Sequence, residues 1–187
     1  MKTLASLFLL SLVALPLWSQ SKNPVSDAAR QTLQNRAKNM PAAADEMPAD
    51  KYSFKPTPQQ ETFGHMQLHI VQANNTLCSA VGGGTPAAED KDLKDTDSKD
   101  KIVAAMKRSF DFCAKALESM DDSKLADAIT VFGRPGTKGA ALLTMAGGWG
   151  DHYASQAMYL RLNGLLPPTA QKTASADAKK DKKDEKY

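Results

Sequence analysis

Apolar residues recur along this chain at alternating three- and four-residue steps, which is the spacing of one face of an α-helix. Three strong stripes of this kind lie at about 63–80, 103–120 and 138–163, and a weaker one lies at 25–40. The connections between them are long, and no convincing sheet pattern separates them. The pattern therefore predicts an all-α protein built as a four-helix bundle.

Glycine and proline mark the expected ends of these helices. Gly82–Gly84 should stop the second helix, and Gly164 is a natural residue to follow the end of the fourth. Pro41 is expected to kink or end the first helix, with a continuation towards Pro48 left open. The run Ile129–Phe132 is compatible with a short extended strand before a turn at 133–136. Residues 85–100 are charged and are expected to form a solvated connection.

The N-terminus has the features of an export signal. Lys2 precedes a short apolar run, Leu4–Leu17, that Pro16 interrupts before it is long enough to span a bilayer. The alternative is an uncleaved membrane anchor. We expect a signal peptide at residues 1–20, a folded unit at 21–169 and a disordered charged tail at 170–187. The mature protein is then expected to be periplasmic or secreted and not attached to a membrane.

Charge argues against nucleic acid as the main partner. The stretch from Gln20 to Thr169 holds 17 basic and 17 acidic residues, so the formal net charge of +3 comes from Lys2 and the tail. A neutral body without a basic patch is not typical of a nucleic-acid-binding protein.

The two cysteines, Cys78 and Cys113, leave two alternatives open. An exported chain can form a disulfide between them, which would link the second and third helices. Otherwise they are small buried hydrophobic residues. Cys113 lies in the apolar stripe of its helix, whereas Cys78 lies off the stripe of its own.

The three histidines are the candidates for chemistry. His65 and His69 lie four residues apart and therefore on one face of the second helix, and His152 lies on the fourth. His69 and His152 fall at the borders of their apolar stripes, where helical bundles build metal sites. Imidazole suits zinc, nickel, copper and iron. The alternative is that these histidines are hydrogen-bonded packing residues.

Several ordered segments resemble one family. They are Lys51–Pro58, Thr62–Gly64 followed by His69 and Asn74, Ser109–Cys113, Asp151–Tyr153, and Tyr159–Pro168. Together they are similar to the DinB/YfiT-like superfamily, and most of all to exported members with a signal peptide. The resemblance covers about residues 42–169.

The resemblance implies a four-helix bundle, often dimeric, with Zn or Ni held by one histidine of the second helix and two of the fourth. His69 and His152 match two of these ligands. The third position, four residues before His152, is occupied by Gly148, which has no side chain to offer. His65 is a candidate replacement, as is a water or a residue of a second subunit.

Two functions follow from these observations. The first is an exported divalent-metal-binding bundle with hydrolase or thiol-transferase activity. The second is a degenerate bundle that serves as a structural, ligand-binding or dimerisation module. The sequence names no catalytic residue and no small-molecule substrate. A homodimer is expected from the resemblance and from apolar residues spread around the fourth helix. These are Tyr153, Met158, Tyr159 and Leu162. The alternative is that the N-terminal segment wraps this face, or that the C-terminal turn at Gly164–Pro168 folds back over it.

Overall fold

The computed structural model describes residues 21–171, so the expected signal peptide and nearly all of the expected tail lie outside the described residues. Four long helices form the fold, which confirms the predicted all-α bundle. They are α1 (Pro24–Glu46), α2 (Phe63–Gly82), α3 (Lys99–Glu118) and α4 (Lys138–Leu162). Short elements join them: η1 (Ala49–Lys51), η2 (Ala88–Asp90), η3 (Asp122–Lys124), β1 (Ala128–Val131) and β2 (Arg134–Thr137).

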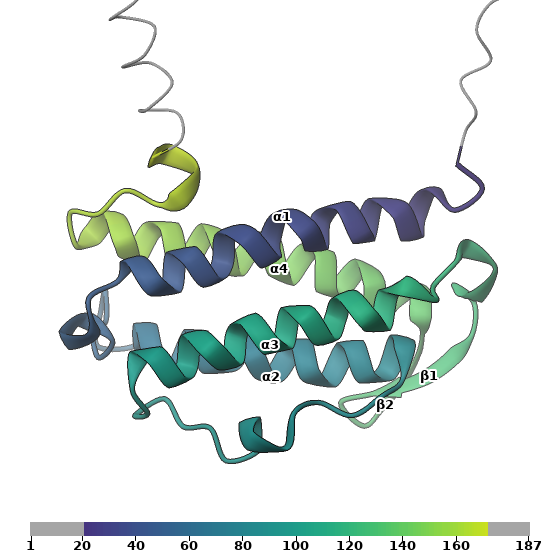
Figure 1. The fold of residues 1–187 in the computed structure, drawn as a ribbon, viewed down its shortest axis with the longest axis horizontal. Coiled ribbons are helices and arrows are strands. Elements are labelled where there is room, and N and C mark those ends of the chain that lie inside the picture. Colours follow the sequence, from purple (N-terminus) through teal and green to yellow (C-terminus); the bar gives the residue numbers. More distant parts are fainter. Residues whose placement is uncertain (1–20, 172–187) are drawn as a thin grey trace, which may run out of the picture.

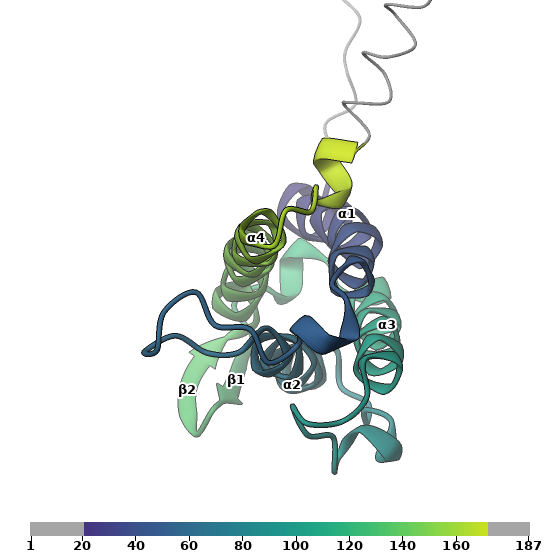
Figure 2. The ribbon, with the colours of Figure 1, turned by 90° about the vertical axis from the view of Figure 1, so that its left-hand side faces the viewer.

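The four helices lie at the corners of a quadrilateral. Seen end-on, α2 has α3 on one side and α4 on the other, and α1 closes the opposite corner (Figures 1 and 2). Each helix therefore packs against two neighbours around a central core. No helix within the described residues is long and apolar enough to cross a membrane.

Local sequence explains where the helices begin and end. The hydroxyls of Thr62, Ser98 and Thr137 each accept a hydrogen bond from a backbone N–H in the first turn of α2, α3 and α4. At the end of α4, Gly164 adopts a φ of 74°. The next amide, of Leu165, donates back to the carbonyl of Leu160 at 3.0 Å. This is a Schellman ending, as the glycine predicted.

The first helix follows the continuation that the sequence left open. α1 runs from Pro24 to Glu46, with Pro41 inside it. An interior proline costs about 3 kcal/mol because it removes a helical hydrogen bond. Met40, Ala43 and Ala44 are fully buried on either side of it. Burial of this turn outweighs the local cost, so the helix does not end at Pro41.

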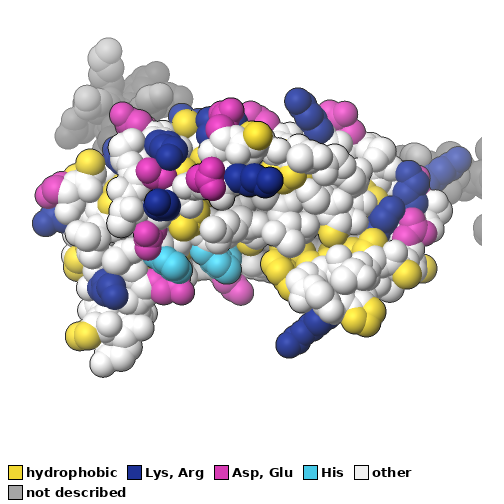
Figure 3. Space-filling view, turned by 90° about the horizontal axis from the view of Figure 1, so that it is seen from below, with side chains coloured by type: hydrophobic (Ala, Val, Ile, Leu, Met, Phe, Trp, Pro, Cys, Tyr) yellow, Lys and Arg dark blue, Asp and Glu magenta, His cyan; other side chains and the backbone are white. Residues whose placement is uncertain are grey.

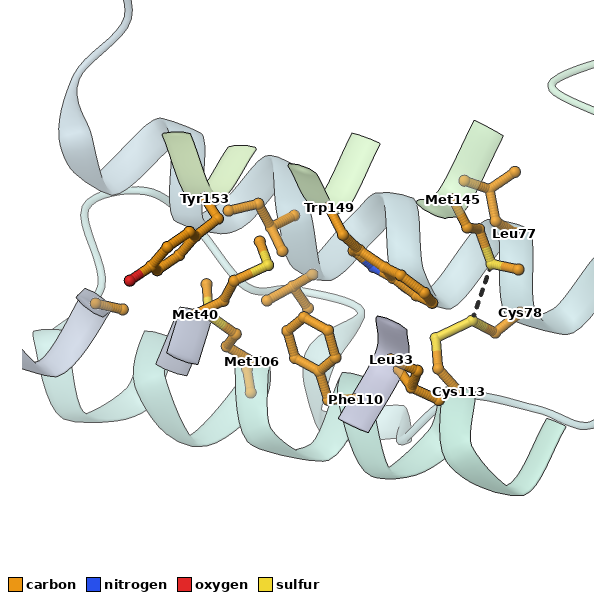
Figure 4. Packing of buried hydrophobic residues seen from close by; sticks show 14 of the residues in the cluster. Leu33, Met40, Leu77, Cys78, Met106, Phe110, Cys113, Met145, Trp149 and Tyr153 are labelled. Atoms are coloured by element: carbon orange, nitrogen blue, oxygen red, sulfur yellow. Dashed lines mark hydrogen bonds between the residues drawn. A yellow bond between two sulfur atoms is a disulfide. The ribbon is translucent and has the colours of Figure 1, made fainter. Parts of the chain in front are cut away.

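The core includes the disulfide that the sequence left open. Cys78 and Cys113 are bonded, with their Cα atoms 5.1 Å apart, and both are fully buried. The Sγ of Cys78 lies 3.5 Å from the Sδ of Met145, so the bridge also packs against α4 (Figure 4). Cys78 is buried although it lies off the main stripe because α2 is covered by two helices, not one.

A small hairpin forms part of the connection from α3 to α4. β1 pairs antiparallel with β2, with Val131 opposite Arg134, so the turn consists of Phe132 and Gly133 alone. The expected strand is present, but the expected turn at 133–136 is wrong because Arg134–Thr137 forms the second strand. Both turn residues have positive φ, 51° and 72°.

The connection between α2 and α3 is more ordered than expected. The buried carboxylate of Asp90 accepts a hydrogen bond from Nη2 of Arg108 at 2.5 Å. The side chain of Leu93 is also buried. The prediction of a solvated connection is therefore wrong for these two residues. The ion pair of Asp90 with Arg108 ties this connection to α3.

The start of α1 and the end of α3 cap one another. The Asp122 carboxylate accepts hydrogen bonds from the backbone N–H groups of Val25 and Ser26, at 3.0 and 2.8 Å. In return, Nη1 of Arg30 donates to the carbonyls of Leu117 and Met120, at 3.0 and 2.7 Å. Free donors and acceptors at two helix ends are thus satisfied by the opposite helix.

Candidate functional site

The fold brings two of the three histidines together. His69 of α2 and His152 of α4 face each other with ring centroids 5.0 Å apart and planes at 72°. Both lie on the border of the α2–α4 contact, as the apolar stripes predicted. The histidine side chains reach the surface of this face, with acidic side chains beside them (Figure 3).

The surroundings of His152 favour its neutral form. Partial burial lowers the pKa of its imidazole, and the neighbouring ring of His69 lowers it further. The carboxylates of Asp151 and Glu61 act in the opposite direction and have the smaller effect. A neutral imidazole has a free nitrogen lone pair, which is the form that binds metal ions and accepts hydrogen bonds.

The third histidine is engaged elsewhere. His65 is exposed, and its Nδ1 lies 3.1 Å from Oδ2 of Asp95 in the loop before α3. Its Nε2 lies 3.8 Å from Oε1 of Glu61. Within residues 21–171 there is no group of three or more His, Cys, Asp or Glu side chains placed to hold a metal. The structure thus pairs His69 with His152 and directs His65 towards acidic partners.

Gly148 leaves open space beside the histidine pair. It lines the same cleft as both imidazoles, one helical turn before His152. A Cβ added at Gly148 would meet no atom of the described chain within 4 Å, leaving aside its two sequence neighbours and the nearby backbone of its own helix. The position where the sequence resemblance led us to expect a third ligand therefore has no side chain, but it has room for one.

The histidines stand at one end of what we call the α2–α4 cleft, a hollow of about 170 Å³. Its apolar wall is formed mainly by Ile70, Leu77, Phe132, Met145 and Trp149. Among the described residues, no Asp, Glu, Lys or Arg lines it. The cleft is therefore a largely apolar space with two imidazoles as its main polar feature.

A buried hydrogen-bond chain fixes the cleft wall. Nε1 of Trp149 donates to Oδ1 of Asn74 at 2.7 Å, and Nδ2 of Asn74 donates to the Ser109 hydroxyl at 3.0 Å. The hydroxyl in turn donates to the carbonyl of Met106 at 2.8 Å. Trp149 also packs against Phe110 below it, with ring centroids 6.1 Å apart (Figure 4). The indole is held rigidly by three helices.

Sequence reasoning overlooked the polar residues of the interior. Asn74 follows Ile70 by four residues and Gln67 follows Phe63 by four, so both lie on the apolar side of α2. A polar residue at such a spacing is the signal that could have identified them. Gln67 and Gln156 are fully buried, and Nε2 of Gln156 donates to Oε1 of Gln67 at 2.6 Å.

Two tyrosines expected at a dimer surface are buried within the chain. The hydroxyl of Tyr153 donates to Oγ1 of Thr169 at 2.9 Å, because the C-terminal turn folds back over this side of α4. The hydroxyl of Tyr159 donates to the carbonyl of Glu61 at 2.8 Å. Met158 and Leu162 remain exposed, as expected.

A larger surface hollow of about 560 Å³ lies at the other end of α2 and is a poorer candidate. One of its two basic side chains, Arg108, is already paired with Asp90 and Glu89, and the other is Lys115. The hollow contains no histidine and lies on the α3 side of the bundle. We therefore place the candidate site in the α2–α4 cleft.

Comparison with known proteins agrees with this architecture. A family model described as the DinB superfamily matches residues 31–155. A crystal structure of a DinB-like protein from Bacillus cereus ATCC 10987 is 21% identical, with a TM-score of 0.64 over 76% of this chain and 95% of that one. A DinB-like protein from Bacillus subtilis is 19% identical, with a TM-score of 0.60 over 75% and 95%. No curated protein matches the chain.

Proposed function

This chain belongs to the DinB superfamily, and from that premise we propose that it binds a divalent metal, Zn²⁺ or Ni²⁺, through His69 and His152. The observation that supports this is the 5.0 Å separation of the two rings across the α2–α4 contact. Two imidazoles that share one tetrahedral Zn²⁺, at about 2.0–2.1 Å each, place their ring centres roughly 5 Å apart. The pair therefore fits two of the ligands that such an ion needs.

The same residues do not fit a three-histidine centre. Gly148 occupies the third position, and His65 is turned towards Asp95. Two protein ligands should hold a metal weakly, because protein centres commonly use three or four. A bound metal would supply Lewis-acid chemistry to a hydrolase or thiol-transferase reaction. The chain's own part is to present two imidazoles beside an apolar wall.

The test is a metal titration by calorimetry on tag-free protein lacking residues 1–20. We expect weak one-to-one binding of Zn²⁺ or Ni²⁺ that is lost when His69 and His152 are both changed to Gln. His65→Gln is the matched control and should bind as the unchanged protein does. Gly148→His should tighten binding at least about tenfold, because it restores a third ligand in open space.

Two results would contradict the proposal. One is a metal content below about 0.1 per chain that does not rise when Zn²⁺ or Ni²⁺ is added. The other is binding that survives in the double variant His69→Gln/His152→Gln. Activity assays become informative only after the titration has succeeded.

The second candidate is a metal-free bundle with a structural, ligand-binding or dimerisation role. Gly148 favours it, since a glycine at this position leaves the family's ligand set incomplete. In that case a chelator should leave the melting temperature unchanged. Cells that carry the variant His69→Gln/His152→Gln should have the same phenotype as cells that carry the unchanged protein.

We also propose that the protein works in the periplasm or outside the cell. The Cys78–Cys113 disulfide supports this, because such bonds persist mainly in oxidising compartments. Cell fractionation of the full chain tests it: the protein should appear in the exported fraction without free thiols. A cytoplasmic protein with two free thiols after denaturation would contradict it.

Finally, we propose an association of two copies through α4, where Met158 and Leu162 are 42% and 56% exposed. The buried tyrosines reduce the apolar surface available for it, so the contact should be weak. Light scattering at micromolar concentration should show a mass above one chain, and Leu162→Lys should return the mass to one chain. A single-chain mass for the unchanged protein would rule this out.

A further inference from the structure

The tip of the hairpin carries a residue that its backbone does not favour. Phe132 and Gly133 form a two-residue turn in which both φ angles are positive. Such turns favour Asn, Asp or Gly, because a side chain with a Cβ crowds the backbone in this region. For a bulky residue the left-handed conformation costs about 1–2 kcal/mol. Local stability therefore disfavours phenylalanine at this position.

Burial in the core does not offset this cost. Phe132 is 66% exposed, and it is the one aromatic side chain among the large exposed hydrophobic residues of the described chain. It nevertheless lines the α2–α4 cleft, at the opposite end from the two imidazoles. A strained and exposed aromatic residue beside a cleft points to a contact made there with something outside the chain.

The dimensions of the cleft limit what that contact can be. Its volume of about 170 Å³ is close to the roughly 150 Å³ of an apolar cavity that can hold benzene. Its wall contains no charged side chain of the described residues. A molecule of about one ring therefore fits, and a larger one would have to extend into solvent.

The polar end of the cleft favours a neutral molecule. No Lys or Arg of the described residues lines the cleft to pair with an anion, and no Asp or Glu lines it to pair with a cation. An ion would therefore lose its hydration there without gaining a partner of opposite charge. The ring nitrogens of His69 and His152 can donate or accept a hydrogen bond, so a hydroxyl or carbonyl group suits them.

We propose that the α2–α4 cleft binds a small neutral molecule, one ring in size, with a hydroxyl or carbonyl group. Its hydrocarbon part contacts Trp149 and Phe132, and its polar group contacts His69 and His152. Phe132 acts as a clamp at the open end of the cleft. This site goes beyond metal binding and does not depend on it.

Trp149 provides a direct signal for binding, because it is the sole tryptophan of the chain once residues 1–20, which include Trp18, are removed. The assay follows its fluorescence in the protein lacking residues 1–20, with a chelator present so that metal plays no part. Benzyl alcohol is the neutral probe, and benzoate is the anion of matched size. We expect a saturable change at about 1 mM benzyl alcohol and at least about tenfold weaker binding of benzoate.

Variants separate the clamp from the stability of the fold. Phe132→Asn should weaken benzyl alcohol binding about tenfold while the melting temperature stays the same or rises, because asparagine tolerates the turn. Phe132→Tyr keeps the ring and should bind normally. Leu143→Ala is the matched control, since Leu143 is 70% exposed and does not line the cleft. Gly148→Leu should fill the cleft and abolish binding.

The proposal fails if benzyl alcohol causes no saturable change in Trp149 fluorescence. It also fails if Phe132→Asn or Gly148→Leu binds as tightly as the unchanged protein. Equal affinity for benzyl alcohol and benzoate would overturn the claim that the cleft prefers a neutral ligand. Because the assay excludes metal, its failure leaves the metal titration as a separate result.

Discussion

The two sides of α2 are built in opposite ways. Towards α3, the helix is joined by the Cys78–Cys113 bond and by the hydrogen bond from Asn74 to Ser109. A methyl group added at Gly82 would lie 2.1 Å from the carbonyl oxygen of Ala116, so the backbones are in contact. Towards α4, the helix borders a cleft, and Gly148 on α4 faces open space.

This difference separates stability from binding. The α2–α3 contact is closely packed and cross-linked, and it holds the two helices in register. The α2–α4 side is less closely packed and leaves a cleft lined by two imidazoles and by the buried indole of Trp149. A bundle can keep a changeable site on one side of a helix when the other side is cross-linked.

The largest effect should come from removing the cross-link on the closed side. Changing both Cys78 and Cys113 to alanine removes a cross-link between positions 35 residues apart, so the unfolded chain is no longer constrained by it. We expect the free energy of unfolding to fall by about 3–4 kcal/mol. Urea unfolding measures this, and a reducing agent should lower the stability of the unchanged protein but not of the variant. A loss below about 1 kcal/mol would show that the bond matters little.

A pair of matched glycine substitutions should separate the two sides most clearly. Gly82→Ala should destabilise the protein by about 2–3 kcal/mol, because the new methyl meets the backbone of α3. Gly148→Ala should instead stabilise it by up to about 1 kcal/mol, because alanine favours a helix and the space is open. Thermal unfolding of the two variants gives the comparison. Equal effects would mean that the two sides do not differ in packing.

A smaller effect is expected where the two sides share a residue. Asn74 binds Ser109 on the closed side and Trp149 on the open side. Trp149→Phe removes the indole N–H and leaves Oδ1 of Asn74 buried without its donor. We expect a loss of about 1–2 kcal/mol in chemical denaturation. No loss would indicate that water reaches Asn74 through the cleft.

The smallest effect is a dependence of stability on pH at the open side. Because the pKa of His152 is lowered in the folded protein, the unfolded chain binds a proton more readily. Stability from this group is therefore complete above the ordinary histidine pKa and falls as pH decreases below it. His152→Gln should reduce the fall in melting temperature between neutral and mildly acidic pH. A profile that stays the same in His152→Gln would contradict this prediction.

The spacing of apolar residues predicted the helices well, because each helix forms where one apolar stripe is buried against its neighbours. It left the outcome open where tertiary contacts decide, as at Pro41, which burial keeps inside α1. It also left open the state of Cys78, which is buried and bonded to Cys113.

The candidate site was predictable only in part. Spacing placed His69 and His152 at facing borders, but it could not show that the side chain of His65 turns towards Asp95. That choice depends on a loop contact rather than on the helix. The role of Phe132 depends on which two residues form the hairpin turn, and a shift of one residue would change it.

The mutual capping of α1 and α3 sets an order of events. The backbone donors at Val25 and Ser26 receive their acceptor from Asp122, which lies 97 and 96 residues further along the chain. The helix that is synthesised first therefore has an incomplete end until α3 and the turn after it have emerged. Attachment of α1 to the rest of the bundle is then expected to be a late step in folding.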